Sequence, residues 1–223
     1  MDLVFSKILV PFFNWGPYYF YLIVLLIAVN KRFGWFKYLS DLSYKFLIWL
    51  VLGFKIVFAS METWSQYYIW SNGDFTKLLL DKNIIDFNIL KEMSGSFFAL
   101  LDNRFGYFIF YSWGRFWFEI VVSLAAAGAF YLFLLFLKKY KERFFEKGET
   151  ELGLLAAFMV GWSNFIVFLP IVFLSVVLVS VFRAIVLKEE YTTLGAPLLL
   201  AALIVLLFGN YLVPLLGLTQ LRI

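Results

Sequence analysis

Charged side chains inside apolar segments are the residues of this sequence best suited to do chemistry. Lys55, Glu119 and Arg183 each lie in or beside a long apolar run. Ionisable groups in such runs are costly, and they often mark ion, proton or substrate paths. Lys55 and Glu119 would lie at similar depth in antiparallel neighbouring helices, where they could pair. The alternative is that Lys55 extends to the membrane interface and Glu119 only marks the start of its run.

A further carboxylate, Glu149, opens an apolar run within Lys147-Gly148-Glu149-Thr150-Glu151. Acidic residues in a first helical turn cap free amides and offset the helix dipole. The alternative is a catalytic carboxylate at the membrane edge, which needs a second carboxylate facing it. Asp41 is the nearest candidate for that second group.

The missing residue types exclude several functions. The chain has no histidine and no cysteine, so the commonest ligands of haem, zinc and iron–sulfur clusters are absent. We therefore expect no metal site and no cofactor. No phosphate-binding glycine loop is present, nor a serine nucleophile with a base. The net charge of +4 is spread along the chain, so no nucleic-acid partner is expected.

The composition of the chain indicates that the helices carrying these charged residues lie in a membrane. Hydrophobic residues make up 63% of the 223 residues and charged residues 15%, against about 45–50% and about 25% in soluble domains. A span needs about 20 apolar residues. The sequence predicts a single all-α membrane domain, a polytopic bundle of about six spans: 17–30, 44–60, 116–137, 152–168, 170–187 and 194–216. The fourth and fifth spans form a hairpin with its turn around 163–170.

Lysine and arginine in short loops predict the orientation. The segments 30–45 and 138–151 are rich in them, and Arg183 and Lys188 flank the next turn. With six spans all three segments face the cytoplasm and both termini face outward. The membrane is expected to be a bacterial inner membrane, with an organellar membrane as the alternative.

The segment 61–115 is expected to be an outward loop that forms a small cap of short helices on the outer leaflet. It is dense in aromatic residues, and loops of this length usually have structure or function of their own. Aromatic belts at membrane interfaces explain much of the enrichment without a ligand.

Residues 148–213 resemble the C-terminal part of type IV prepilin leader peptidases. In that family Gly-Asp opens a span, Gly-Trp follows about a dozen residues later, and a Phe-Gly-Pro-Phe-like segment starts the last helix. Here the corresponding segments are Gly148-Glu149, Gly161-Trp162, Leu194-Gly195-Ala196-Pro197 and Phe208-Gly209-Asn210. The resemblance implies that Glu149 stands where the family has a catalytic aspartate.

A larger part of the chain resembles prolipoprotein diacylglyceryl transferase. The matching segments are Gly16-Pro17, Asp41-Leu42, 49–53, Gly161-Trp162-Ser163-Asn164-Phe165 and Gly217-Leu218-Thr219-Gln220. Gly161, Asn164 and Phe165 fit the Gly-Arg-x-Gly-Asn-Phe signature of that family. The resemblance implies a seven-span fold, of which six spans are matched here, with a long outward arm and a lipid substrate.

The residues that would bind the anionic head group in that family are replaced here. Trp162 stands at the signature arginine, Asn210 stands at the arginine of the sixth span, and the histidine is missing. The favoured hypothesis is therefore a non-catalytic scaffold or subunit of a membrane complex, with membrane lipids and other membrane subunits as partners. The alternatives are an enzyme of either family, acting through Glu149 or Glu119, and a small transporter with Lys55, Glu119 and Arg183 along a polar path.

Overall fold

The structure, a computed structural model, describes residues 10–80, 105–188 and 193–221. The described residues form helices and connecting segments, without a strand. Five helical runs are long and apolar enough to cross a membrane: Pro11–Phe33, Tyr44–Asn72, Gly106–Tyr140, Trp162–Val186 and Gly195–Leu215. The prediction of an all-α, multi-pass membrane protein is confirmed at this level.

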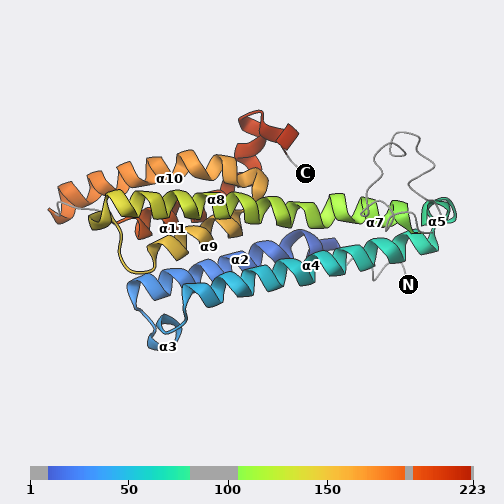
Figure 1. Cartoon of the computed structure of the whole chain (residues 1–223), viewed down its shortest axis with the longest axis horizontal. Helices are drawn as coiled ribbons and strands as arrows, with labels where there is room; N and C mark the ends of the chain where they lie inside the picture. Colours follow the sequence, from blue (N-terminus) through green and yellow to red (C-terminus); the bar gives the residue numbers. More distant parts are fainter. Residues whose placement is uncertain (1–9, 81–104, 189–192, 222–223) are drawn as a thin grey trace. The chain divides into compact units, whose positions relative to one another are not determined.

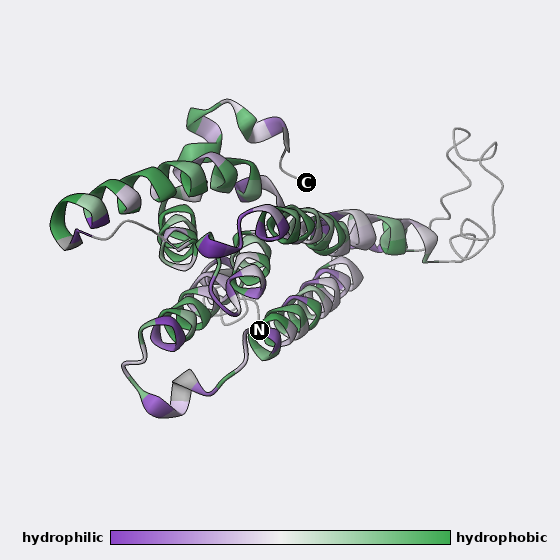
Figure 2. Cartoon of the chain, turned by 60° about the vertical axis from the view of Figure 1, so that its left-hand side comes forward, coloured by the Kyte–Doolittle hydropathy of each residue, from purple (hydrophilic) through white to green (hydrophobic). Residues whose placement is uncertain are grey.

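The elements follow one another as long helices joined by short ones (Figure 1). Their bounds are α2 (Val10–Phe33), α3 (Lys37–Ser40), α4 (Tyr44–Asn72), α5 (Asp74–Leu80), α7 (Gly106–Ser112), the π-helical turn η3 (Trp113–Trp117), α8 (Phe118–Tyr140), η4 (Glu142–Phe144), α9 (Glu149–Val160), α10 (Trp162–Phe182), the π-helical turn η5 (Arg183–Leu187), α11 (Gly195–Leu215) and η6 (Leu218–Leu221). Hydrophobic residues run along the long helices, and hydrophilic residues gather mainly at helix ends and in the connections (Figure 2).

The chain divides into two compact units. Unit 1 comprises Met1–Gly53 and Val122–Arg222, and unit 2 comprises Phe54–Val121. The helices α4 and α8 each contribute residues to both units.

In unit 1, α9 is the buried centre of the packing. Every residue of α9 except Glu151 and Leu154 is buried, and α9, α10 and α11 lie side by side (Figure 1). Gly153 allows this close packing, because a Cβ there would collide with a methyl group of Leu134 in α8. A 12-residue apolar helix is too short to cross the bilayer and is typical of a buried or re-entrant segment.

The expected hairpin turn around 163–170 is wrong in position. The chain turns at Gly161, whose φ of 79° ends α9, and α10 then runs without a break from Trp162 to Phe182. Positive φ favours glycine because a Cβ would clash with the backbone. Pro170 lies inside α10, and proline is tolerated there because neighbouring groups in a membrane bundle satisfy the freed carbonyl. With α9 at 12 residues, the expected span 152–168 is replaced by a short buried helix and the start of α10.

In unit 2, the ends of the expected 61–115 loop belong to long helices. α4 continues beyond residue 60 to Asn72, and the run that contains α8 begins at Gly106 rather than 116. No glycine or proline interrupts residues 61–72, so polarity alone does not end the helix. Hydropathy predicts which part of a helix is covered by lipid, but it does not predict the residue at which the helix ends. Residues 81–104 of the expected cap lie outside the described residues.

Aromatic side chains hold the helical segments of unit 2 together. Trp70 packs against Tyr107, Phe108 and Tyr111 with ring centroids 6.1, 5.5 and 5.0 Å away. Tyr67 adds an edge-on contact with Phe108 at 5.7 Å. Such pairs contribute about 0.5–1.5 kcal/mol each beyond area burial. The aromatic enrichment of this segment therefore builds a helix–helix contact.

Candidate functional site

Three helix ends of unit 1 meet at one polar cluster. Arg32 lies in the last turn of α2, Glu149 is the first residue of α9, and Gly195 is the first residue of α11. Glu146 and Thr193 complete the group, which we call the Glu149 cluster. The local sequence explains the arrangement: Gly148, with φ of 91°, turns the chain into α9 and leaves the first residue of that helix facing α11.

The Glu149 carboxylate uses both of its oxygens. Oε1 accepts a hydrogen bond from the backbone N–H of Gly195 at 2.8 Å, and Oε2 accepts one from the backbone N–H of Glu146 at 3.0 Å. The first N–H groups of a helix have no partner within the helix, so Glu149 supplies one to α11. The residue is only 2% exposed. Its position is that of a helix cap acting between two helices.

Arg32 provides the positive charge of the Glu149 cluster. One guanidinium nitrogen, Nη2, lies 3.3 Å from Glu149 Oε1, 2.8 Å from Glu146 Oε1 and 2.8 Å from Thr193 Oγ1. The other, Nη1, donates to Glu146 Oε2. Hydrogen bonding from Arg32 lowers the pKa of the Glu146 carboxyl from its usual value. This planar two-pronged pairing is the geometry that arginine favours with carboxylates.

The Glu149 cluster is poorly suited to catalysis. A general base or nucleophile must reach its substrate, whereas Glu149 is enclosed and already bonded to two backbone amides and a guanidinium. Among the described residues, no group of three or more acidic side chains is arranged to hold a metal ion. What the cluster does physically is join the end of α2 to the starts of α9 and α11.

Unit 2 has a second group of charges, which we call the Lys55 cluster: Lys55 and Glu62 of α4, Arg115 of η3 and Glu119 of α8. Lys55 is 8% exposed, whereas Glu119 lies at the protein surface. The charge of Glu119 acts on both Lys55 and Glu62, and that of Arg115 acts on Glu62. The structure thus places Lys55 and Glu119 in one electrostatic group. Whether they pair for a function stays a hypothesis.

A direct hydrogen bond lies beside the Lys55 cluster. Trp117 Nε1 donates to Thr63 Oγ1 at 3.1 Å, and the same hydroxyl donates to the carbonyl of Ala59 at 2.8 Å. Trp117 ends the π-helical turn η3. Such turns occur frequently at functional sites, which is why this region of unit 2 is a candidate site.

The third predicted ionisable residue, Arg183, belongs to unit 1. It is the first residue of η5, and its charge acts on Glu146 of the Glu149 cluster. Of the three residues of the expected polar path, Lys55 and Glu119 therefore belong to unit 2 and Arg183 to unit 1.

The three residues on which the transferase resemblance was based, Gly161, Asn164 and Phe165, have packing roles here. Gly161 makes the turn between α9 and α10. Asn164 donates a 3.4 Å hydrogen bond to the carbonyl of Val160, and it lies so close to Gly209 that a Cβ there would be 2.9 Å from Asn164 Oδ1. The ring of Phe165 packs against Phe130 with centroids 6.0 Å apart.

Sequence reasoning missed Arg32 and Glu146 as site residues. Arg32 was assigned only to the basic loop that orients the protein, and its bonds reach residues 114 and 161 positions away. No local pattern marked Glu146, which lies in the connection before α9, three residues ahead of the first residue of that helix.

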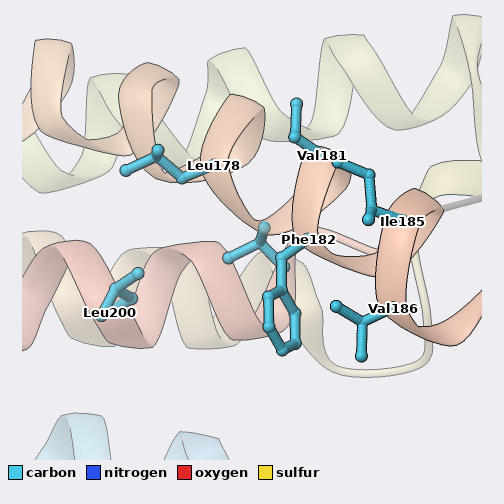
Figure 3. Close-up of a pocket in the computed structure, with 7 residues that line it drawn as sticks. Leu178, Val181, Phe182, Ile185, Val186 and Leu200 are labelled. Atoms are coloured by element: carbon cyan, nitrogen blue, oxygen red, sulfur yellow. The ribbon is translucent and has the colours of Figure 1, made fainter.

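Unit 1 also has an apolar hollow of about 590 Å³ between α10 and α11. Figure 3 shows the residues that line it, among them Leu178 and Phe182 of α10, Ile185 of η5 and Leu200 of α11. All the side chains that line it are apolar. The hollow offers space for an acyl chain or an apolar side chain but no group for chemistry.

Comparisons with protein-family models, with curated proteins and with solved structures find no match to this chain.

Proposed function

We propose that this protein is a non-catalytic scaffold or subunit of a membrane complex. The observation that carries the proposal is that the Glu149 carboxylate is buried and hydrogen-bonded to two backbone amides. This residue stands at the catalytic position of the peptidase resemblance, yet its two oxygens cap α11 and the turn before α9. A carboxylate held in this way stabilises helix ends.

The exposed surface of the helices supports the same proposal. In the most apolar 18-residue stretch of each candidate span, no more than 39% of the residues are buried inside the molecule. Large apolar side chains along α10, including Phe173, Leu174 and Phe182, lie at the surface. In a membrane this surface faces either lipid or other subunits, and transmembrane helices associate through such packed faces.

Purification of the full chain from its own membranes in nanodiscs, followed by mass spectrometry, tests the proposal. A partner polypeptide at fixed stoichiometry is the expected result. A protein without partners that also turns over a lipoprotein or prepilin precursor would contradict it. The Glu149→Gln variant then separates the cases, because loss of turnover with an intact fold would make Glu149 a catalytic residue.

The orientation forms part of the proposal: the end that bears Lys31, Lys45 and Lys147 faces the cytoplasm, and both termini face outward. The reversal of the chain at Gly161 supports it, since α10 returns toward the basic end (Figure 1). The chain has no native cysteine, so single cysteines at Lys147 and Thr219 can be labelled separately. An impermeant maleimide applied to intact cells should label the cysteine at 219 and not the one at 147, and the reverse pattern would invert the orientation.

A further inference from the structure

A cavity of about 470 Å³, open to the outside and lined by several charged side chains, lies in unit 1 where α2 ends and where α4 and α9 begin. Three lysines from three segments line it: Lys31 of α2, Lys45 of α4 and Lys147 of the turn before α9. Two carboxylates, Asp41 and Glu151, also line it. The volume falls within the range of about 300–1,000 Å³ that is typical of small-molecule sites.

The convergence of the lysines goes beyond the general charge bias of a cytoplasmic face. That bias places lysines at one end of the helices, but it does not direct three of them into one cavity. Lys31 is positioned by the ring of Tyr44, with its Nζ 5.2 Å from the ring centroid. Gly148 packs against the same ring, since a Cβ there would lie 3.1 Å from it. The wall of the cavity is therefore built by close packing.

The electrostatics of the cavity favour a phosphate group. The lysines outnumber the carboxylates by one, and two helices of 29 and 12 residues begin beside them. The start of α4, which has no acidic residue in its first turn, adds positive potential, whereas Glu149 and Glu151 offset that of α9. The two carboxylates suit a ligand that carries a hydrogen-bond donor, such as a hydroxyl or ammonium group, next to its phosphate.

We infer that this cavity binds a phosphate group, carried by the head group of a membrane phospholipid whose distal hydroxyl or ammonium group meets Asp41 and Glu151. The lipid is favoured over free phosphate because the cavity lies at the ends of α2 and α4, which are long and apolar enough to cross the membrane. Basic pockets between helices on the cytoplasmic side are a known mode of lipid recognition. This inference is independent of whether the protein has partner subunits.

The test compares two triple variants of equal charge by native mass spectrometry of the full chain. One carries Lys31→Gln, Lys45→Gln and Lys147→Gln, which remove the lysines of the cavity. The control carries Lys138→Gln, Lys139→Gln and Lys141→Gln, from the same charge-rich stretch of the sequence but not lining the cavity. The probes are phosphatidylglycerol, diacylglycerol (which lacks phosphate) and inorganic phosphate. The melting temperature of each variant reports folding, and the single variant Lys147→Gln, at an exposed turn position, is the fallback.

Retention of phosphatidylglycerol by the wild type and the control, with a loss of about tenfold or more in the cavity variant, is expected from about 1 kcal/mol for each lysine near a lipid surface. Equal retention in both variants, or equal loss, overturns the inference. Retention of diacylglycerol as strong as that of phosphatidylglycerol does so too. Displacement of the lipid by millimolar inorganic phosphate would assign the site to a soluble phosphate and overturn the lipid assignment.

Discussion

The Glu149 cluster of unit 1 and the Lys55 cluster of unit 2 both combine acidic and basic side chains on membrane helices, but they are built differently. In the Glu149 cluster the carboxylate bonds directly to two backbone amides, and a guanidinium bridges it to Glu146. In the Lys55 cluster the negative charge of Glu119, at the protein surface, acts on the nearly buried ammonium group of Lys55. The difference teaches that the Glu149 carboxylate is fixed by backbone hydrogen bonds from two chain segments, whereas Glu119 acts on Lys55 from the protein surface.

The largest effect is expected for Glu149→Gln. An amide side chain has one acceptor end and one donor end, whereas the site requires an acceptor toward both Gly195 and Glu146. The variant also leaves the Arg32 charge with one partner fewer. We expect a loss of about 3 kcal/mol, measured by thermal unfolding in detergent. Glu151→Gln, two residues further along α9, should cost less than about 1 kcal/mol, and similar losses in the two variants would break the comparison.

The next effect is expected for Gly195→Ala. A Cβ at this position would lie 2.6 Å from Glu149 Oε1 and 2.9 Å from Arg32 Nε, so the methyl group would push both charged groups apart. A loss of about 2 kcal/mol is expected. The matched control is Gly128→Ala in α8, where a Cβ meets no atom within 4 Å. That control should gain up to about 1 kcal/mol from helix propensity, and a gain at Gly195 would show that the packing is looser than described.

A smaller effect is expected for Lys55→Met in unit 2. Methionine fills a similar volume without the cost of a nearly buried ammonium group, and the surface carboxylate Glu119 is not left enclosed. We expect the stability to change by less than about 1 kcal/mol in either direction. A loss as large as that of Glu149→Gln, in the same unfolding measurement, would make the Lys55 cluster structural as well.

The smallest effect is the pH dependence of Glu146. Its pKa is lowered in the folded protein by the hydrogen bond from Arg32, so the stabilisation is present above the usual pKa of 4.5 and is lost as the pH falls through the lowered folded value. The wild type should therefore lose more thermal stability than Glu146→Gln between pH 7 and pH 3. Because Glu146 is half exposed, solvent screening keeps the difference small. Equal losses in the two proteins would place the Arg32 interaction elsewhere.

The sequence predicts which segments form membrane helices better than it predicts where those helices end. Apolar runs identify α2, α4, α8, α10 and α11, because burial in lipid requires them. The extension of α4 to Asn72 was missed because its polar and aromatic residues read as a loop, although nothing there breaks a helix. The turn was predicted around 163–170 from the polar residues 161–164 together with Pro170, but only Gly161 breaks the helix and Pro170 lies inside α10.

Only part of the Glu149 cluster could be predicted from the sequence. Glu149 was identified as a helix cap from its position, and it caps a helix, but that helix is α11 rather than its own. The contact joins residues 46 positions apart, and the Arg32 contact joins residues 114 apart. Local sequence patterns do not reveal contacts between residues that lie this far apart in the chain.

The shortness of α9 has a consequence for how the protein is made. At 12 residues, α9 cannot leave the translocation machinery as an independent spanning helix, so it must enter the bilayer together with α10 as a hairpin. The hydrogen bond from the Gly195 N–H to the Glu149 carboxylate can form only after Gly195, at the start of α11, has been synthesised. The Glu149 cluster is therefore completed only after α11 has been made.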